Sequence, residues 1–219
     1  MKYLKGDITN FRELWFLDQY LAGIKGFVAG GCFKNILSGQ RAKDLDIFFR
    51  NQADFADALN VYKGYITSKS EWIKSYENKK VFAAYNSKTK VRVELNRSIF
   101  GTPEDILNDF DFTITQFAYY SQSAIKEEVR DTDVLAELDD TILEFKVIYH
   151  PDFFEHLQQK RLVISNLPFP VSTFERSLRY TKYGFGLCKE SKVKLVKALH
   201  DIPILDDNTL SNSLYDGKD

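Results

Sequence analysis

The sequence lacks the features that mark secreted, membrane-spanning and thiolate-metal proteins. Cys32 and Cys188 are the only cysteines, too few for a disulfide framework, and neither stands near a second cysteine or histidine at metal-ligand spacing. The chain begins without an apolar signal segment, and no run approaches the roughly eighteen apolar residues needed to cross a bilayer. We therefore expect a cytoplasmic protein with reduced thiols and no membrane partner.

Histidine and net charge also point to no particular chemistry. His150, His156 and His200 are isolated in the sequence and are not expected to be catalytic, and the formal net charge is −1. The charges are nevertheless segregated. Acidic residues gather within 104–144, whereas lysine and arginine predominate within 160–200. Such segregation indicates either a local attraction for phosphates or solvated helix faces of opposite sign.

Apolar periodicity predicts an α+β fold: a small mixed or antiparallel sheet flanked by helices. Short apolar runs bounded by glycine or polar residues indicate strands, and apolar residues repeated every three to four positions indicate helices. The expected helices cover 11–21, 32–37, 52–60, a short stretch after Pro103, 150–162 and 191–200. The expected strands are 26–29, 44–49, 81–85 and 91–95, the last two forming a hairpin. Residues 112–120 fit either a strand or a helix.

A further helix is predicted from a capping box. Ser172 stands three residues before Glu175, shortly after Pro170, the spacing at which both side chains bind the first amides of a helix. Gly184 and Gly186 are expected to end it. We divide the chain into a head of residues 1–149, a helical region of 150–203 and a polar tail of 204–219 without a core-forming pattern.

The residues that indicate chemistry begin at a glycine pair. Gly30 and Gly31 follow an apolar strand and open a helix, so backbone amides can approach a phosphate. Asp44 and Asp46 stand two apart on the next expected strand and therefore project from one face. Such carboxylates share hard cations, chiefly Mg²⁺, with substrate phosphate oxygens.

A third carboxylate would complete the candidate site. Glu94 lies with Arg92 on the polar face of strand 91–95. Beside the two aspartates it would form a two-metal site, in which one ion activates an attacking hydroxyl and the other binds the leaving pyrophosphate. Each motif alone is weak evidence, and the hypothesis depends on their order and spacing.

These segments resemble the head of bacterial-type CCA-adding enzymes and poly(A) polymerases, within the polymerase-β-like nucleotidyltransferase superfamily. The similar segments are 30–39, 43–47, 93–95 and 111–114, followed by 176–185, which resembles the Arg-rich neck helix that recognises the incoming base. The resemblance implies a nucleotidyltransferase head with a neck-like region, Mg²⁺ or Mn²⁺ as metal and an NTP as substrate. It implies Asp44, Asp46 and Glu94 as catalytic metal ligands, and Gly30, Gly31, Lys34, Asn35, Asp111, Arg176, Arg179 and Lys182 as nucleotide-binding residues.

The sequence departs from this family in its phosphate-binding cations. Lys34 and Asn35 stand where the family usually has Arg-Asp, and Asp109 and Phe110 stand where it has an arginine pair. Lysine binds phosphate as a point charge without the bidentate fork of arginine. We expect no counterpart of the family's tRNA-binding body and tail domains after the neck-like helices. We therefore expect an acceptor held only near its 3′ end, or one presented by a partner protein.

Arg176, Arg179 and Lys182 recur every three residues, which predicts a basic ridge facing the same cleft as Asp46. Tyr183 would lie beside Arg179, so that a base stacks on tyrosine or arginine while phosphates meet the cations. The alternative is a helix whose cations pair with the acidic segment 104–144.

The sequence thus predicts metal-dependent transfer of a nucleoside monophosphate from an NTP to an acceptor hydroxyl, first of all at an RNA 3′ end resembling that of tRNA. Two alternatives stay open: transfer to a small molecule or a protein side chain, and a catalytically silent nucleotide- or RNA-binding module. Three clustered carboxylates argue against a silent module, because unselected acidic clusters repel and cost stability. The missing arginines argue for it.

Overall fold

Strands far apart in the sequence combine into one sheet with helices on both faces. The computed structural model describes residues 2–121, 145–203 and 206–214. The strands are β1 (Leu4–Asp7), β2 (Gly26–Ala29), β3 (Asp44–Phe49), β4 (Trp72–Glu77), β5 (Val81–Asn86), β6 (Val91–Phe100), β7 (Phe117–Ser121), β8 (Phe145–Tyr149), β9 (Arg161–Leu162) and β10 (Gly186–Leu187). The helices are α1 (Asp18–Leu21), α2 (Cys32–Ile36), α3 (Gln52–Ser68), α4 (Pro103–Asn108), α5 (Phe153–Gln158), α6 (Pro170–Thr181), α7 (Lys189–His200) and α8 (Asp207–Ser213).

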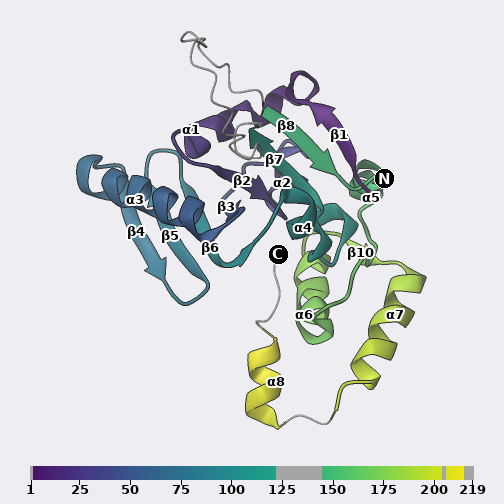
Figure 1. Cartoon of the computed structure of the whole chain (residues 1–219). Helices are drawn as coiled ribbons and strands as arrows, with labels where there is room; N and C mark the ends of the chain where they lie inside the picture. The colour runs from purple at the N-terminus through teal and green to yellow at the C-terminus, as the bar shows by residue number, and fades with distance from the viewer. Residues whose placement is uncertain (1, 122–144, 204–205, 215–219) are drawn as a thin grey trace, which may run out of the picture.

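The eight strands of the main sheet follow the order β1-β8-β7-β2-β3-β6-β5-β4 (Figure 1). The pairing of β3 with β6 is parallel, and the other pairings in this sheet are antiparallel. The sheet is therefore mixed, as expected for the α+β class. Helices α6, α7 and α8 gather at one end of the molecule, below the sheet in Figure 1. Among the described residues, no helix combines the length and apolar character needed to cross a bilayer.

The middle of the sheet is buried on both faces. Because side chains alternate along a strand, Leu45 and Ile47 of β3 enter a large core cluster on the α3 side. Phe48 points the other way and packs in a second cluster with residues of α4. Asp44 and Asp46 share the Phe48 side but lie near the start of β3, where they are not fully buried. The strand thus anchors its carboxylates through an apolar second half.

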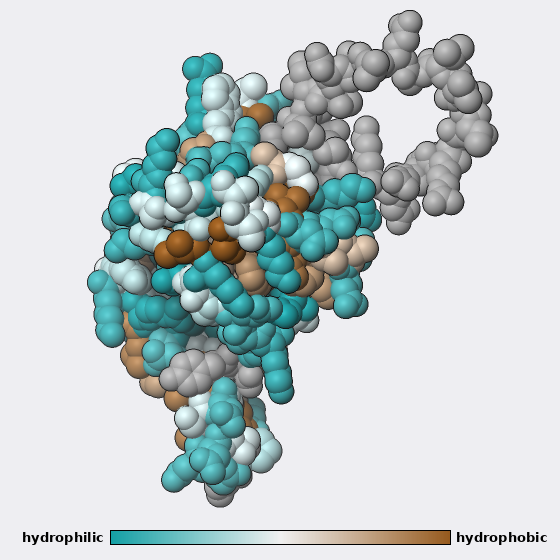
Figure 2. All heavy atoms as spheres, turned by 90° about the vertical axis from the view of Figure 1, so that its left-hand side faces the viewer, coloured by the Kyte–Doolittle hydropathy of each residue, from teal (hydrophilic) through white to brown (hydrophobic). Residues whose placement is uncertain are grey.

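Edge strand β4 was not predicted from the sequence. Trp72 is its only buried residue, so no alternation marks it. The indole packs against Tyr62 and Tyr65, and these contacts extend α3 to Ser68, beyond the expected residue 60. Figure 2 faces this side of the molecule and shows a largely hydrophilic surface with a limited hydrophobic group. Charged side chains on the edge, such as Lys74 and Glu77, oppose pairing with another sheet.

Several expected boundaries are wrong because tertiary contacts override local patterns. The helix expected over 11–21 is a 3₁₀ helix, Arg12–Leu17, followed by α1. Residues 150–162 contain only α5 and then β9. Residues 112–120 contain a 3₁₀ turn, Thr113–Thr115, and most of β7. The polar tail contains α8, which Asp206 caps and which has no buried residue. The acidic stretch 122–144 lies outside the described residues.

The helix predicted after Pro170 is present, but the capping box expected to begin it is not formed. Helix α6 begins at Pro170, so Ser172 and Thr173 lie inside its first turns and are buried. Their hydroxyls accept hydrogen bonds from Arg176 at 2.7 and 3.3 Å. The Arg176 Nη2 atom also lies 2.6 Å from Asp111 Oδ2. These contacts form a buried ion pair that joins α6 to the loop before β7.

Replacing Arg176 with methionine is expected to lower the free energy of unfolding by about 3–5 kcal/mol, because Asp111 would remain buried without its partner. Urea unfolding measures the change. Arg179→Met is the matched control, since Arg179 is exposed one turn later. The double variant Arg176→Met, Asp111→Asn should regain stability because it leaves no uncompensated buried charge. Equal stability of the two single variants would contradict this structural role.

Candidate active site

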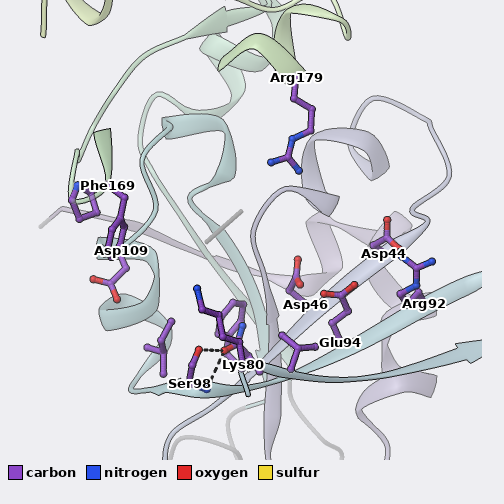
Figure 3. Close-up of a pocket in the computed structure, with 14 residues that line it drawn as sticks. Asp44, Asp46, Lys80, Arg92, Glu94, Ser98, Asp109, Phe169 and Arg179 are labelled. Atoms are coloured by element: carbon purple, nitrogen blue, oxygen red, sulfur yellow. Dashed lines mark hydrogen bonds and ion pairs between the residues drawn. The ribbon is translucent and has the colours of Figure 1, made fainter. Parts of the chain in front are cut away.

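The parallel pairing of β3 with β6 brings two candidate ligands side by side. Asp46 is the register partner of Glu94, and Asp44 is the partner of Arg92. Register partners on neighbouring strands point to the same face, so Asp46 and Glu94 project together. Figure 3 shows both carboxylates directed into one pocket. The expected proximity of Glu94 to the aspartates is therefore present.

Asp44 has a different environment. Its Oδ1 atom lies 3.2 Å from Arg92 Nη1, and both side chains are about half exposed. Figure 3 shows Asp44 turned toward Arg92. The buried Nε of Arg92 makes no hydrogen bond with the described residues, so the ion pair is monodentate. A half-exposed, monodentate pair contributes little stability and can be exchanged for another cation.

The carboxylates also affect neighbouring groups. Burial, and next the neighbouring Glu94 carboxylate, raises the pKa of the Tyr76 hydroxyl above its ordinary value. Complete burial, with a contribution from Asp46, raises the pKa of the Cys32 thiol. Both groups therefore stay protonated at neutral pH, and Cys32 is not a nucleophile.

Two pockets meet at the aspartates. The large pocket, of about 560 Å³, is lined by Glu94, Lys80, Asn96, Ser98, Asp109 and Phe169 among others. The small pocket, of about 180 Å³, is lined by Gly31, Cys32, Lys34, Asn35, Lys43, Tyr180 and Tyr183. Asp44, Asp46 and Arg179 line both pockets. The acidic group thus lies at the junction of two spaces of different size and chemistry.

The glycine pair shapes the wall of the small pocket. Gly30 has a φ of 103°, a conformation that side chains with a Cβ rarely adopt. Its amide donates to the carbonyl of Phe117 at 3.1 Å. A Cβ on Gly31 would lie 3.0 Å from the Tyr180 hydroxyl. The two glycines therefore turn the chain from β2 into α2 and let α6 approach.

Lys34 is held on the inner wall of the small pocket. Its side chain is only 8% exposed, and its ammonium donates to Asn35 Oδ1 at 2.8 Å. The same ammonium lies 5.3 Å from the ring centre of Tyr180 and 4.9 Å from that of Tyr183. Two aromatic faces and an amide oxygen thus fix a cation near Asp46.

The expected basic ridge is not formed. Arg179 reaches the junction of the two pockets from α6 (Figure 3). Arg176 is turned away, buried with Asp111, so the expectation that it faces the cleft is wrong; neither residue of that pair lines the two pockets. Lys182 follows the end of α6, is exposed and also lines neither pocket. Helix α6 presents Arg179 to the site.

Sequence reasoning missed much of the large pocket. Asn96 and Ser98 share the face of Glu94 because β6 continues to Phe100, and their polar alternation could have revealed this. Lys80 and Phe169 come from loops with no local signal. Tyr76 was missed because β4 was missed.

Asp44, Asp46 and Glu94 are the side chains that could hold a divalent metal ion at this site. Within the described residues, no three Asp, Glu, His or Cys side chains are already arranged as a metal cluster. The donor chemistry still suits a hard cation, since Asp46 and Glu94 are register partners and Asp44, two residues before Asp46, shares their face. The arrangement differs from a complete site in the turn of Asp44 toward Arg92.

Comparison with known sequences places the chain in a family. Residues 5–160 match the family described as Gabija anti-defense 2 family protein. The chain belongs to the Gabija anti-defense 2 family. It is 23% identical over 195 residues to Gabija anti-defense 2 of Bacillus phage SPbetaL7, covering 86% of this chain and 40% of that protein. This chain therefore spans less than half the length of its phage relative.

Solved structures show that this family member has a nucleotidyltransferase-like fold. The Thermotoga maritima CCA-adding enzyme complexed with tRNA aligns with a TM-score of 0.58 at 18% identity, over 90% of this chain and 46% of the enzyme. A CCA-adding enzyme complexed with ATP aligns with a TM-score of 0.59 at 15% identity, over 90% and 47%. The resemblance to the CCA-adding enzyme head is confirmed at the level of the fold.

Replacing Gly30 with alanine should lower the free energy of unfolding by about 1–3 kcal/mol, the usual cost of a strained backbone position. Thermal unfolding measures this change. Gly64→Ala is the control: Gly64 lies in α3 with no atom within 4 Å of an added Cβ, and alanine should stabilise the helix by about 0.5–1 kcal/mol. Similar effects at the two glycines would contradict the role given to Gly30.

Proposed function

We propose that this chain is a metal-dependent nucleotidyltransferase that moves a nucleoside monophosphate from an NTP to an acceptor hydroxyl and releases pyrophosphate. The observation that carries the proposal is the parallel register that sets Asp46 beside Glu94 at the junction of two pockets. The CCA-adding enzyme fold supports it. Two substrates need two spaces, and a metal needs carboxylates that both spaces reach. The two pockets that share Asp44 and Asp46 meet both needs.

The metal ligands in this proposal are Asp46, Glu94 and Asp44. Bound Mg²⁺ or Mn²⁺ would stabilise the charge that develops on the transferred phosphoryl group and lower the pKa of the attacking hydroxyl. Asp46 and Glu94 already face the pocket (Figure 3). Asp44 is available because its ion pair with Arg92 is monodentate and half exposed.

The two pockets suit different parts of the reaction. Phosphoryl transfer places the attacking and leaving oxygens on opposite sides of the transferred phosphorus. The small pocket contains Lys34, Lys43 and Asn35, which can bind the triphosphate by point charges and hydrogen bonds. We therefore assign it to the NTP phosphates, and we assign the large pocket to the acceptor. Arg179, which lines both, would contact the nucleotide between them.

An RNA 3′ end is the first acceptor to consider. Phe169 is 38% exposed and lines the large pocket with Lys80, so a terminal base can stack on the ring while a phosphate meets the ammonium. A strand 3′ end also carries the required hydroxyl. The large pocket can hold a terminal nucleotide without contacts to the rest of a tRNA.

The family name favours a second acceptor. The phage relative is named Gabija anti-defense 2, and transfer of a nucleotide to a hydroxyl side chain of a Gabija protein would inactivate a partner covalently. Labelled NTP incubated with total RNA and, separately, with Gabija proteins would show where the label is transferred. Label found only on protein would show that the acceptor is a protein side chain and not an RNA 3′ end.

Asp46→Asn and Glu94→Gln should each lower transfer from labelled NTP at least about 100-fold, because even supporting partners of metal ligands contribute 10–100-fold. Asp57→Asn, on the exposed face of α3, is the matched control and should leave the rate unchanged. Circular dichroism confirms folding of each variant. Transfer at the wild-type rate by either site variant would refute the metal assignment.

Each pocket contains a lysine whose replacement tests which substrate that pocket binds: Lys34 in the small pocket and Lys80 in the large one. Lys34→Met should raise the KM for NTP about tenfold or more, as expected from loss of a charge-assisted contact of about 1.5–3 kcal/mol. Lys80→Met should instead raise the KM for the acceptor and leave that for NTP unchanged. The reverse pattern would exchange the roles of the pockets.

A further inference from the structure

An irregularity in edge strand β4 directs Tyr76 toward the carboxylates. Lys74 pairs with Ala84, but Tyr76 pairs with Ala83, so Ser75 is an extra residue in β4. Without this bulge Tyr76 would face Phe82, whose side chain is buried in the core on the opposite side of the sheet. Bulges near functional sites often redirect a side chain in this way.

The residues between Tyr76 and Glu94 permit contact across a whole strand. Ala83 is the register partner of both, Tyr76 on one side and Glu94 on the other. Its small side chain leaves the space above β5 open, so the Tyr76 hydroxyl comes close enough to Glu94 for that carboxylate to raise its pKa. Tyr76, Ala83, Glu94 and Asp46 thus form one row across four strands.

The ring of Tyr76 has a second contact. The Arg92 guanidinium carbon lies 5.9 Å from the ring centre, near the limit for a cation–π contact. Arg92 in turn holds Asp44 at 3.2 Å. One tyrosine on the sheet edge therefore lies beside Glu94 and beside the arginine that pairs with Asp44.

We propose that Tyr76 is a positioning residue, which fixes Glu94 through its hydroxyl and steadies Arg92, and hence Asp44, through its ring. The assignment rests on the proposed function. A free glutamate on a strand samples several rotamers, and fixing it before the metal arrives removes that entropy cost from binding. In this role the phenol would donate to one carboxylate oxygen and leave acceptor capacity for a cation, as partners of metal ligands commonly do.

A purely structural role for Tyr76 leads to different expectations. The side chain is 38% exposed, so its ring adds little to the core. If Tyr76 only packed against the sheet, removal of the hydroxyl would leave metal affinity unchanged. If it positions Glu94, the same change weakens metal binding while the melting temperature stays constant.

The test compares Tyr76→Phe, Tyr76→Leu and the control Tyr65→Phe in the full chain. Tyr65 stacks on Trp72 outside both pockets. Two quantities are measured: Mn²⁺ affinity by calorimetry without nucleotide, and kcat and KM for labelled NTP over a Mg²⁺ series. Tyr76→Phe should weaken Mn²⁺ binding and raise the Mg²⁺ concentration for half-maximal rate about tenfold, with the KM for NTP at saturating Mg²⁺ unchanged.

Tyr76→Leu should weaken both further, because Arg92 also loses its ring contact, whereas Tyr65→Phe should match the wild type. Unchanged metal affinity and Mg²⁺ dependence in Tyr76→Phe, beside an active wild type, would overturn this inference and leave the proposed function intact. If the wild type transfers no nucleotide, the Mn²⁺ measurement still decides: weaker binding by Tyr76→Phe supports the positioning role, and equal binding overturns it. A wild type that binds no Mn²⁺ overturns both.

Discussion

The site depends on the register between β3 and β6. These strands form the one parallel pair of the main sheet in the described residues, and the pairing sets Asp46 opposite Glu94. A shift of one residue in either strand would send one carboxylate into the core. The apolar side chains on the opposite face, including Leu45 and Val93, resist such a shift because they are fully buried. The core that stabilises the sheet therefore also fixes the distance between the candidate ligands.

The sequence predicted the parts of the site that depend on local spacing. Gly30 and Gly31 precede a helix, and Asp44 and Asp46 alternate with apolar residues, so their structural setting could be inferred from neighbours. Glu94 could be placed on the polar face of its strand for the same reason. The parallel partner of that strand could not be inferred, because pairing of residues nearly fifty positions apart leaves no local pattern.

The failures have equally physical causes. A periodicity of three predicted that Arg176 and Arg179 share a face, but it carried no information on which side of the helix meets the protein. Asp111, distant in the sequence, takes Arg176 into the interior and leaves Arg179 at the pockets. Strand β4 was overlooked because it lies at the sheet edge and buries only Trp72, so its sequence shows no alternation of apolar and polar residues. The bulge at Ser75 is visible only in the pairing of β4 with β5, and so it could not be predicted from the sequence.

The position of β4 at the sheet edge has a dynamic consequence. One side of this strand is paired with β5, and no strand of the described residues lies on the other. Its hydrogen bonds are therefore among those that open locally at low free-energy cost. Each opening would separate the phenol of Tyr76 from the carboxylate of Glu94 without unfolding the core. Fraying of a peripheral strand would therefore be transmitted to the centre of the molecule as rotamer disorder of a single glutamate.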